Sequence, residues 1–153
     1  MKMINKRLEE EKKRPFIGVG ILVYKQGKIL IGESVSKKTG TVFRGVPGGH
    51  LENNEKIAAC AKREVYEETN VIIDNVGLVS VYEFFNDERN RSYVTIGMRA
   101  DWISNDPLDN VDTSSIRKNW KWMFPEDALK IGNLFPPDRV LIERSLSGIM
   151  YES

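Results

Sequence analysis

The stretch that decides the fold spans residues 49–71 and reads GHLENNEKIAACAKREVYEETNV. Glu, Lys, Arg and Ala dominate its residues 55–69, which makes this the most helical part of the chain. On a helical wheel, Glu64, Glu67 and Glu68 fall at positions i, i+3 and i+4. These three side chains therefore form one acidic patch on the predicted helix.

The acidic patch shares its side of the helix with apolar residues. Ile57, Cys60 and Ala61 lie on that side, whereas Glu55, Lys62 and Tyr66 lie opposite. We therefore expect the three carboxylates to point towards the body of the protein. Half-buried carboxylates lose hydration and like charges repel at i, i+4, so a cation must offset the cost. The single positive charge of Arg63 is too small to balance four glutamates. We therefore expect a hard divalent metal with oxygen ligands, Mg²⁺ (or Mn²⁺).

Pro47, Gly48 and Gly49 come just before this helix and are expected to interrupt the preceding strand. Glycine lets the backbone turn sharply and approach a ligand closely. The carbonyl oxygen of Gly48 is therefore a further candidate metal ligand.

These residues resemble the Nudix box, G-x5-E-x7-R-E-U-x-E-E-x-G-U, in which U is a bulky aliphatic residue. The matching positions are Gly49, Glu55, Arg63, Glu64, Val65, Glu67, Glu68 and Val71. The five charged positions alone would match by chance on the order of 10⁻⁶ per start site at typical composition. The departure is Asn70, which stands where the box has its second glycine. Asn is the next-best residue for a left-handed helix end, so we expect catalysis to remain intact.

The resemblance implies an α/β fold, the Nudix-type α/β/α sandwich with a mixed β-sheet. It divides the chain into a charged N-terminal arm or helix over residues 1–14 and a single Nudix hydrolase domain over residues 15–153. It also implies hydrolysis of a nucleoside diphosphate linked to another moiety, by in-line attack of a metal-activated water on phosphorus.

Site roles are carried over from the family position by position. Glu64 and Glu68 would be the principal metal ligands, Glu67 would help, and Gly48 would contribute its carbonyl oxygen. Arg63 would orient Glu55 or Glu67, which completes a catalytic set of Glu55, Arg63, Glu67 and Glu68. The general base stays open between Glu67, Glu68 and an acid of the loop 104–117, such as Asp109 or Asp112. Some members carry a further Glu before the late tryptophan strand, where this chain has Lys118.

Outer motifs extend the resemblance to the MutT-like branch of nucleoside-triphosphate diphosphatases, which includes hydrolases of modified or oxidised purine nucleotides. These motifs are VPGGHLE, YVTIGM, WKWM and NLFPP. The resemblance places Thr95, Leu134 and Phe135 near the base, and Arg44 could reach phosphates. Aromatic candidates for a base-binding wall are Phe135, Trp120, Trp122, Tyr82 and Tyr93, with core packing as the alternative for each Trp and Tyr. His50 could touch phosphate or bond the backbone, and Cys60 reads as core filler.

Strand and loop patterns alternate along the rest of the chain. Strands are expected over residues 16–24, from residue 29 onward, and over residues 42–46, 71–85, 92–103 and 119–123. Helices are expected over residues 2–14 and 126–130, and a last helix from an N-cap at Asp138 to about Gly148. Residues 104–117 are expected to form a loop.

Composition sets the outer limits on function. Of 153 residues, 23 are Lys or Arg and 22 are Asp or Glu, and this near-neutral balance disfavours long nucleic acid and anionic membranes as partners. Cys60 is the single cysteine, so no intrachain disulfide can form and a reducing, cytoplasmic location is expected. The N-terminus has no apolar stretch of signal-peptide length, and the longest apolar run is too short to span a bilayer. By resemblance alone we expect a homodimer.

Three functions remain open at this stage. The first is a Mg²⁺-dependent nucleoside-triphosphate diphosphatase that releases pyrophosphate. The second is a hydrolase of another nucleoside-diphosphate derivative, such as ADP-ribose, a dinucleotide or capped RNA. The third is a non-catalytic nucleotide-binding module, against which the complete set of stacked carboxylates argues.

Overall fold

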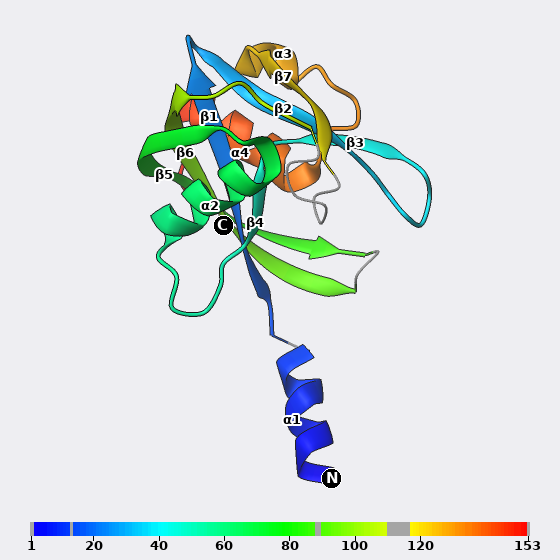
Figure 1. Ribbon diagram of the computed structural model, residues 1–153. Coiled ribbons are helices and arrows are strands. Elements are labelled where there is room, and N and C mark those ends of the chain that lie inside the picture. Colours follow the sequence, from blue (N-terminus) through cyan, green and yellow to red (C-terminus); the bar gives the residue numbers. More distant parts are fainter. Residues whose placement is uncertain (1, 13, 88–89, 110–116, 153) are drawn as a thin grey trace.

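The computed structural model describes residues 2–12, 14–87, 90–109 and 117–152, and within them one mixed sheet carries helices on both faces (Figure 1). The elements in chain order are α1 (Lys2–Lys12), β1 (Phe16–Lys25), β2 (Lys28–Val35), β3 (Val42–Gly45), β4 (Gly48–His50), α2 (Ile57–Thr69), β5 (Ile72–Asn86), β6 (Arg91–Ser104), β7 (Lys118–Met123), α3 (Pro125–Ala128) and α4 (Pro136–Ser147). This layering is the predicted α/β/α sandwich.

The sheet is organised around β1. Its strand order is β3-β2-β1-β6-β5, while β4 pairs with β1 and β7 pairs with β2. β1 runs parallel to β6 and antiparallel to β2 and β4, so the sheet is mixed as predicted. Gly20 of β1 lies opposite Gly48 of β4 and Gly97 of β6, which gives one row of the sheet almost no side chains.

Side chains of β1 are buried on both faces, because α2 covers one face and α3 and α4 cover the other (Figure 1). Ile21 packs in the cluster that holds Cys60 and Ala61 of α2. Leu22, its neighbour, packs in the cluster that holds Leu141 of α4. Each fully buried aliphatic side chain of this kind contributes about 1.5–3 kcal/mol to folding. Cys60 is therefore core filler, as the sequence predicted.

Several expected boundaries differ from those of the structure. Gly48 and Gly49 do not break the chain into a loop but form β4, because Gly48 pairs with Gly20 of the neighbouring strand. α2 starts at Ile57 rather than at residue 55, with Lys56 extended at its N-cap. α3 spans Pro125–Ala128, whereas the expected helix covers residues 126–130.

Asp138 is not the N-cap of the last helix. Phe135 holds that position, and Pro136 and Pro137 form the first turn, since proline has no N–H to satisfy there. Asp138 follows in the same turn and is buried. The helix ends as expected at Gly148, whose φ of 77° is left-handed.

α1 projects away from the sandwich (Figure 1), and its apolar side chains Met3 and Ile4 are 86% and 64% exposed. This agrees with a solvated N-terminal helix. Among the described residues, no helix combines the length and the apolar character needed to cross a membrane.

Candidate functional site

The acidic patch of α2 faces β4. α2 is anchored by Cys60, Ala61 and Val65, which are fully buried, and this fixes which way the glutamates point. The helix ends at Asn70 in a left-handed conformation with φ of 68°, and the Asn70 N–H bonds the carbonyl oxygen of Tyr66 at 2.8 Å. Asparagine thus performs the turn that the family motif assigns to glycine, as predicted.

Glu68 is the most deeply buried of the three glutamates, at 8% exposure. Its Oε1 accepts a hydrogen bond from the N–H of Gly48 at 2.8 Å. Burial raises the pKa of Glu68 to about 7, although the charge of Arg117 and the Gly48 N–H act in the opposite direction. A carboxylate in this position gains from any cation that reaches it.

Glu64 lies beside the second glycine of β4. Its pKa is also raised, chiefly by burial, even though Nη1 of Arg63 bonds it at 2.8 Å. A Cβ on residue 49 would lie 2.2 Å from the carboxyl carbon of Glu64. Only glycine at this position lets the strand and the carboxylate lie this close together.

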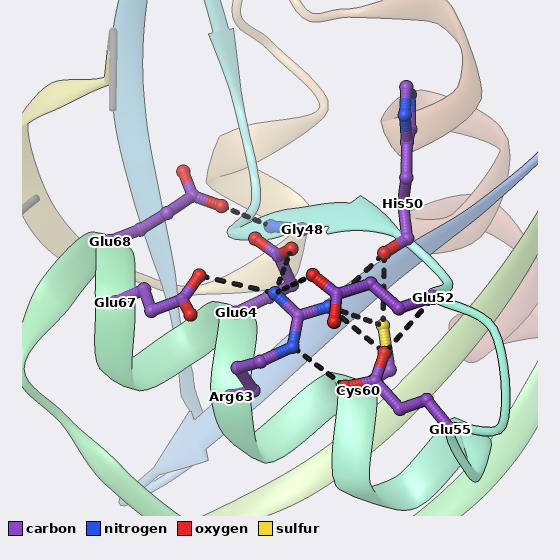
Figure 2. A network of polar contacts seen from close by, with 9 residues as sticks. All are labelled: Gly48, His50, Glu52, Glu55, Cys60, Arg63, Glu64, Glu67 and Glu68. Carbon is purple, nitrogen blue, oxygen red and sulfur yellow. Dashed lines mark hydrogen bonds and ion pairs between the residues drawn. The ribbon is translucent and has the colours of Figure 1, made fainter. Parts of the chain in front are cut away.

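Arg63 is the centre of the polar network (Figure 2). Its Nε and Nη2 bond both oxygens of Glu55, at 2.7 and 2.9 Å, and its Nη1 bonds Glu64 and also Glu67, at 3.2 Å. Nη2 also donates to the carbonyl oxygen of His50 at 3.2 Å. The prediction was that Arg63 orients either Glu55 or Glu67, and in the structure it contacts both.

Glu55 does not lie on the far side of the helix, as the wheel suggested. It precedes α2 in the loop and folds back onto Arg63, whose hydrogen bonds lower its pKa to about 2. Among the four glutamates of the family motif, Glu67 has the most open side chain, which is 40% exposed.

The residues present fit a divalent metal of the Mg²⁺ class. The available donors are carboxylate and carbonyl oxygens, and the anions nearest β4, Glu64 and Glu68, are destabilised by burial. Within the described part of the chain, no three acidic, histidine or cysteine side chains already converge as a finished ligand set. Mg²⁺ does not require one, since it keeps several waters and combines one or two carboxylates with substrate phosphates.

Arg44 does not join this network. Its guanidinium pairs with Glu33 at 3.4 Å, beside a cavity of about 210 Å³ that Asn119 and Lys121 also line. None of the box glutamates lines that cavity. The proposed contact of Arg44 with phosphates stays a prediction without support from its present partner.

Of the two acids of the loop 104–117 that were candidates for the general base, only Asp109 lies in the described residues. The Asp109 carboxylate accepts the N–H of Asn119 at 2.9 Å, and Asp112 lies outside the described residues. Lys118 is exposed. Its neighbour Arg117 is the residue whose charge reaches Glu68, a role that the sequence analysis missed because no local pattern marks it.

An aromatic row crosses the sheet next to β4. We use this name for Phe16, His50, Tyr93, Phe84 and Phe135. The rings of Phe16 and His50 stack at 4.9 Å, Tyr93 lies 5.5 Å from Phe16, and Phe84 meets Phe135 edge-on at 5.5 Å. Strand pairing places Phe16 opposite Tyr93 and Tyr93 opposite Phe84. His50 thus belongs to a row of rings, which neither of its predicted roles included.

The predicted base contacts divide into two groups. Thr95 lies opposite Gly18 and Tyr82, directly beside the aromatic row, and Phe135 is a member of that row. Leu134, in contrast, is 5% exposed and packs in the core. Trp120 and Trp122 pack against the other core cluster, which favours the packing interpretation for both.

Comparison with known proteins adds one family match, two curated relatives and one solved structure. A family model described as NUDIX domain matches residues 14–144. Diphosphoinositol polyphosphate phosphohydrolase 3-beta of Homo sapiens is 35% identical over 86 residues, which are 56% of this chain and 50% of that protein. Phosphatase NudJ of Shigella boydii is 24% identical over 127 residues, which are 81% of this chain and 78% of that protein. A solved NUDIX hydrolase from Nitrosomonas europaea superposes with a TM-score of 0.76 at 25% identity, covering 90% of this chain and 93% of that one. The chain spans about half the length of the curated relatives that match it first.

Proposed function

Because this chain belongs to the NUDIX family, we propose that it is a Mg²⁺- or Mn²⁺-dependent hydrolase that cleaves a nucleoside triphosphate to the monophosphate and pyrophosphate. The family match confirms the resemblance drawn from residues 49–71, and the likeness to the Nitrosomonas hydrolase confirms the predicted Nudix-type fold. The observation that carries the proposal is the position of half-buried Glu64 and buried Glu68 against the glycines of β4.

In this proposal each residue of the network has a distinct task. Glu64 and Glu68 bind the metal, together with the carbonyl oxygen of Gly48. When bound, the metal lowers the pKa of a coordinated water and neutralises charge on the phosphate oxygens. Arg63 holds Glu55, Glu64 and Glu67 in place. Glu67 is our first candidate for the group that accepts a proton from the attacking water, because its side chain is more exposed than those of Glu55, Glu64 and Glu68.

The aromatic row supports a nucleobase as the distal part of the substrate. Base rings stack on aromatic side chains, with about 1–3 kcal/mol gained for each base. The row ends at His50, one residue from Gly49, so a base on the row and phosphates at the glutamates would lie within one ligand. Purine triphosphates, including modified or oxidised ones, fit this arrangement.

Two of the described arginines are directed at backbone carbonyl oxygens rather than at a ligand. Arg139 bonds the carbonyl oxygens of Leu129 and Ile131, and Arg144 bonds that of Val81. The arginine nearest the row is Arg91, which stacks on Phe16 at 3.7 Å. A ligand with many phosphates would need several cations directed at it.

A second candidate is hydrolysis of another diphosphate compound, which the likeness to the human phosphohydrolase supports. A panel assay separates the candidates. The full chain is incubated with Mg²⁺ and each of four groups of compounds: nucleoside triphosphates with and without an oxidised base, ADP-ribose and dinucleotides, capped RNA, and a diphosphoinositol polyphosphate. Release of pyrophosphate from a triphosphate supports our proposal, and turnover of another group alone replaces it. Turnover of none, with nucleotide binding retained, would identify a non-catalytic module.

Three further parts of the proposal concern the oligomeric state, the location and the division of the chain. A homodimer is proposed from the family resemblance, and sedimentation of the full chain measures it directly. A cytoplasmic location is proposed from the single buried cysteine, Cys60. The division into an arm over residues 1–14 and one hydrolase domain over residues 15–153 is likewise a proposal.

A further inference from the structure

Asp138 is a buried carboxylate that lies outside the Arg63 network and has no task in the proposed hydrolysis. It belongs to the first turn of α4, and only 5% of it is exposed. A carboxylate buried this deeply loses its hydration, so its surroundings must compensate for the charge. Its contacts indicate what it does.

Asp138 reaches from α4 to the segment that joins β3 to β4. Its Oδ2 accepts a hydrogen bond from the backbone N–H of Val46 at 3.0 Å and lies 3.6 Å from Nη1 of Arg117. A Cβ on residue 45 would lie 2.2 Å from the same oxygen. Gly45 therefore leaves the space that this carboxylate occupies.

The segment that Asp138 holds leads directly into the proposed metal site. Val46 is followed by Pro47, whose carbonyl oxygen accepts the N–H of Ile21 at 2.9 Å. Gly48 comes next, and its N–H bonds Glu68 at 2.8 Å. Residues 46–48 are thus held by a carboxylate of α4 at one end, by β1 in the middle, and by a carboxylate of α2 at the other end.

We propose that Asp138 and Arg117 are positioning residues for the metal site, which act by fixing the backbone of residues 46–48. The carbonyl oxygen of Gly48 belongs to that backbone and is a proposed ligand. This inference rests on the proposed function, because it gives the pair a role in that metal site. Groups that orient the ligands of a metal typically cost about 10–100-fold in metal affinity or activity when they are removed.

Arg117 pairs with Asp138, and its charge also acts on Glu68 at the other end of the segment. Its charge lowers the pKa of both Asp138 and Glu68, whereas burial raises both. A buried ion pair is a poor source of stability compared with apolar side chains of similar volume. We therefore assign the pair to placing the backbone rather than to stabilising the fold.

Two other roles for Asp138 lead to different measurements. A purely structural residue would change the melting temperature on mutation and leave the metal affinity of the folded protein unchanged. A residue that contacts the substrate would change KM and the preference among bases, without changing metal binding in the absence of substrate.

The experiment measures Mn²⁺ binding to the full chain without substrate, by electron paramagnetic resonance of the free ion, and then kcat and KM with the nucleotide that is turned over. Asp138→Ala removes the acceptor for Val46, and we expect the Kd for Mn²⁺ to rise about 10–100-fold, with a lower kcat and little change in KM. Asp138→Asn keeps an oxygen that can accept this hydrogen bond and should fall between the wild type and Asp138→Ala. Arg117→Lys should retain most of the affinity that Arg117→Gln loses.

Asp127→Asn is the matched control, because Asp127 also lies in the first turn of a helix but pairs with exposed Lys130 at 3.4 Å. It should bind Mn²⁺ like the wild type. If the wild type binds no Mn²⁺, the proposed function fails and this inference fails with it. If the wild type binds and folded Asp138 variants bind equally tightly, only this inference is overturned. Should Asp138→Ala not fold, unchanged affinity in Asp138→Asn and Arg117→Gln overturns it.

Discussion

Two sets of charged residues lie at opposite ends of the same short segment, residues 46–48, and they are built differently. One is the group of box glutamates with Arg63, of which Glu68 bonds Gly48, and the other is Asp138 with Arg117. On α2 the glutamates gather around Arg63, whose partners Glu64 and Glu67 are one and four residues away along the chain. On α4, Asp138 bonds a backbone N–H 92 residues away and is almost fully buried. The first set is local and partly open, so it can change partners when a ligand binds. The second is long-range and buried away from water, which suits it to fixing a backbone in place.

The largest effect is expected from Glu64→Gln, which tests the local set. The amide keeps the size of the side chain but loses the charge that a divalent metal needs, so kcat/KM should fall more than about 100-fold. The melting temperature should stay within a few degrees, because Glu64 is not a core residue. Glu126→Gln, on the exposed side of α3, serves as the control and should keep full activity. Full turnover by Glu64→Gln would remove this residue from the site.

The long-range set makes a prediction about pH and stability. Burial raises the pKa of Asp138 from 3.8 to about 6, so the folded protein binds this proton more tightly than the unfolded chain. The stability contributed by the group is fully present below about pH 4 and is lost as the pH rises through 6, by at most about 3 kcal/mol. Asp138→Asn carries no titrating group at this position.

Comparing the wild type with Asp138→Asn isolates the effect that titration of Asp138 has on stability. Urea unfolding is measured for both at pH 4 and pH 7.5 in a metal chelator. The free energy of unfolding of the wild type should fall relative to that of Asp138→Asn between the two pH values. A constant difference would mean that the carboxylate is solvated in solution and does not occupy the buried position.

The difference between local and long-range contacts also explains what the sequence could predict. The spacing of Glu64, Glu67 and Glu68 fixes one helix face, so their shared placement follows from 3.6 residues per turn, whereas the role of Arg63 came from the family resemblance. β4 was missed because pairing of Gly48 with Gly20 depends on the sheet, and glycine has no strand preference of its own.

The errors around α4 have the same origin. Asp138 matches the sequence preference for an N-cap, but two prolines before it form the first turn and move the cap to Phe135. The buried carboxylate then bonds Val46 in the distant segment between β3 and β4, which no sequence window around Asp138 contains. The ion pair with Arg117 was missed for the same reason.

A smaller effect is expected on the aromatic row. Phe135→Ala removes the ring that meets Phe84 at 5.5 Å and leaves the network around Arg63 untouched. If a base stacks on the aromatic row, KM for the nucleotide should rise about tenfold while Mn²⁺ binding stays the same. Phe85→Ala is the matched control, because Phe85 is 51% exposed and points to the opposite face of β5. An equal rise of KM in both variants would show that the row does not bind the base.

The smallest effect is expected where the chain departs from the family motif. Asn70→Gly removes the strain of a side chain at φ of 68°, but it also makes the unfolded chain more flexible, and each effect is below about 1 kcal/mol. The two oppose each other, so both the melting temperature and kcat/KM should stay close to those of the wild type. Asn70→Val should instead lower the melting temperature clearly, since a β-branched residue does not tolerate a left-handed conformation. A large gain of activity in Asn70→Gly would mean that the helix end is not equivalent in the two sequences. The local set would then depend on its C-terminal turn as much as on Arg63.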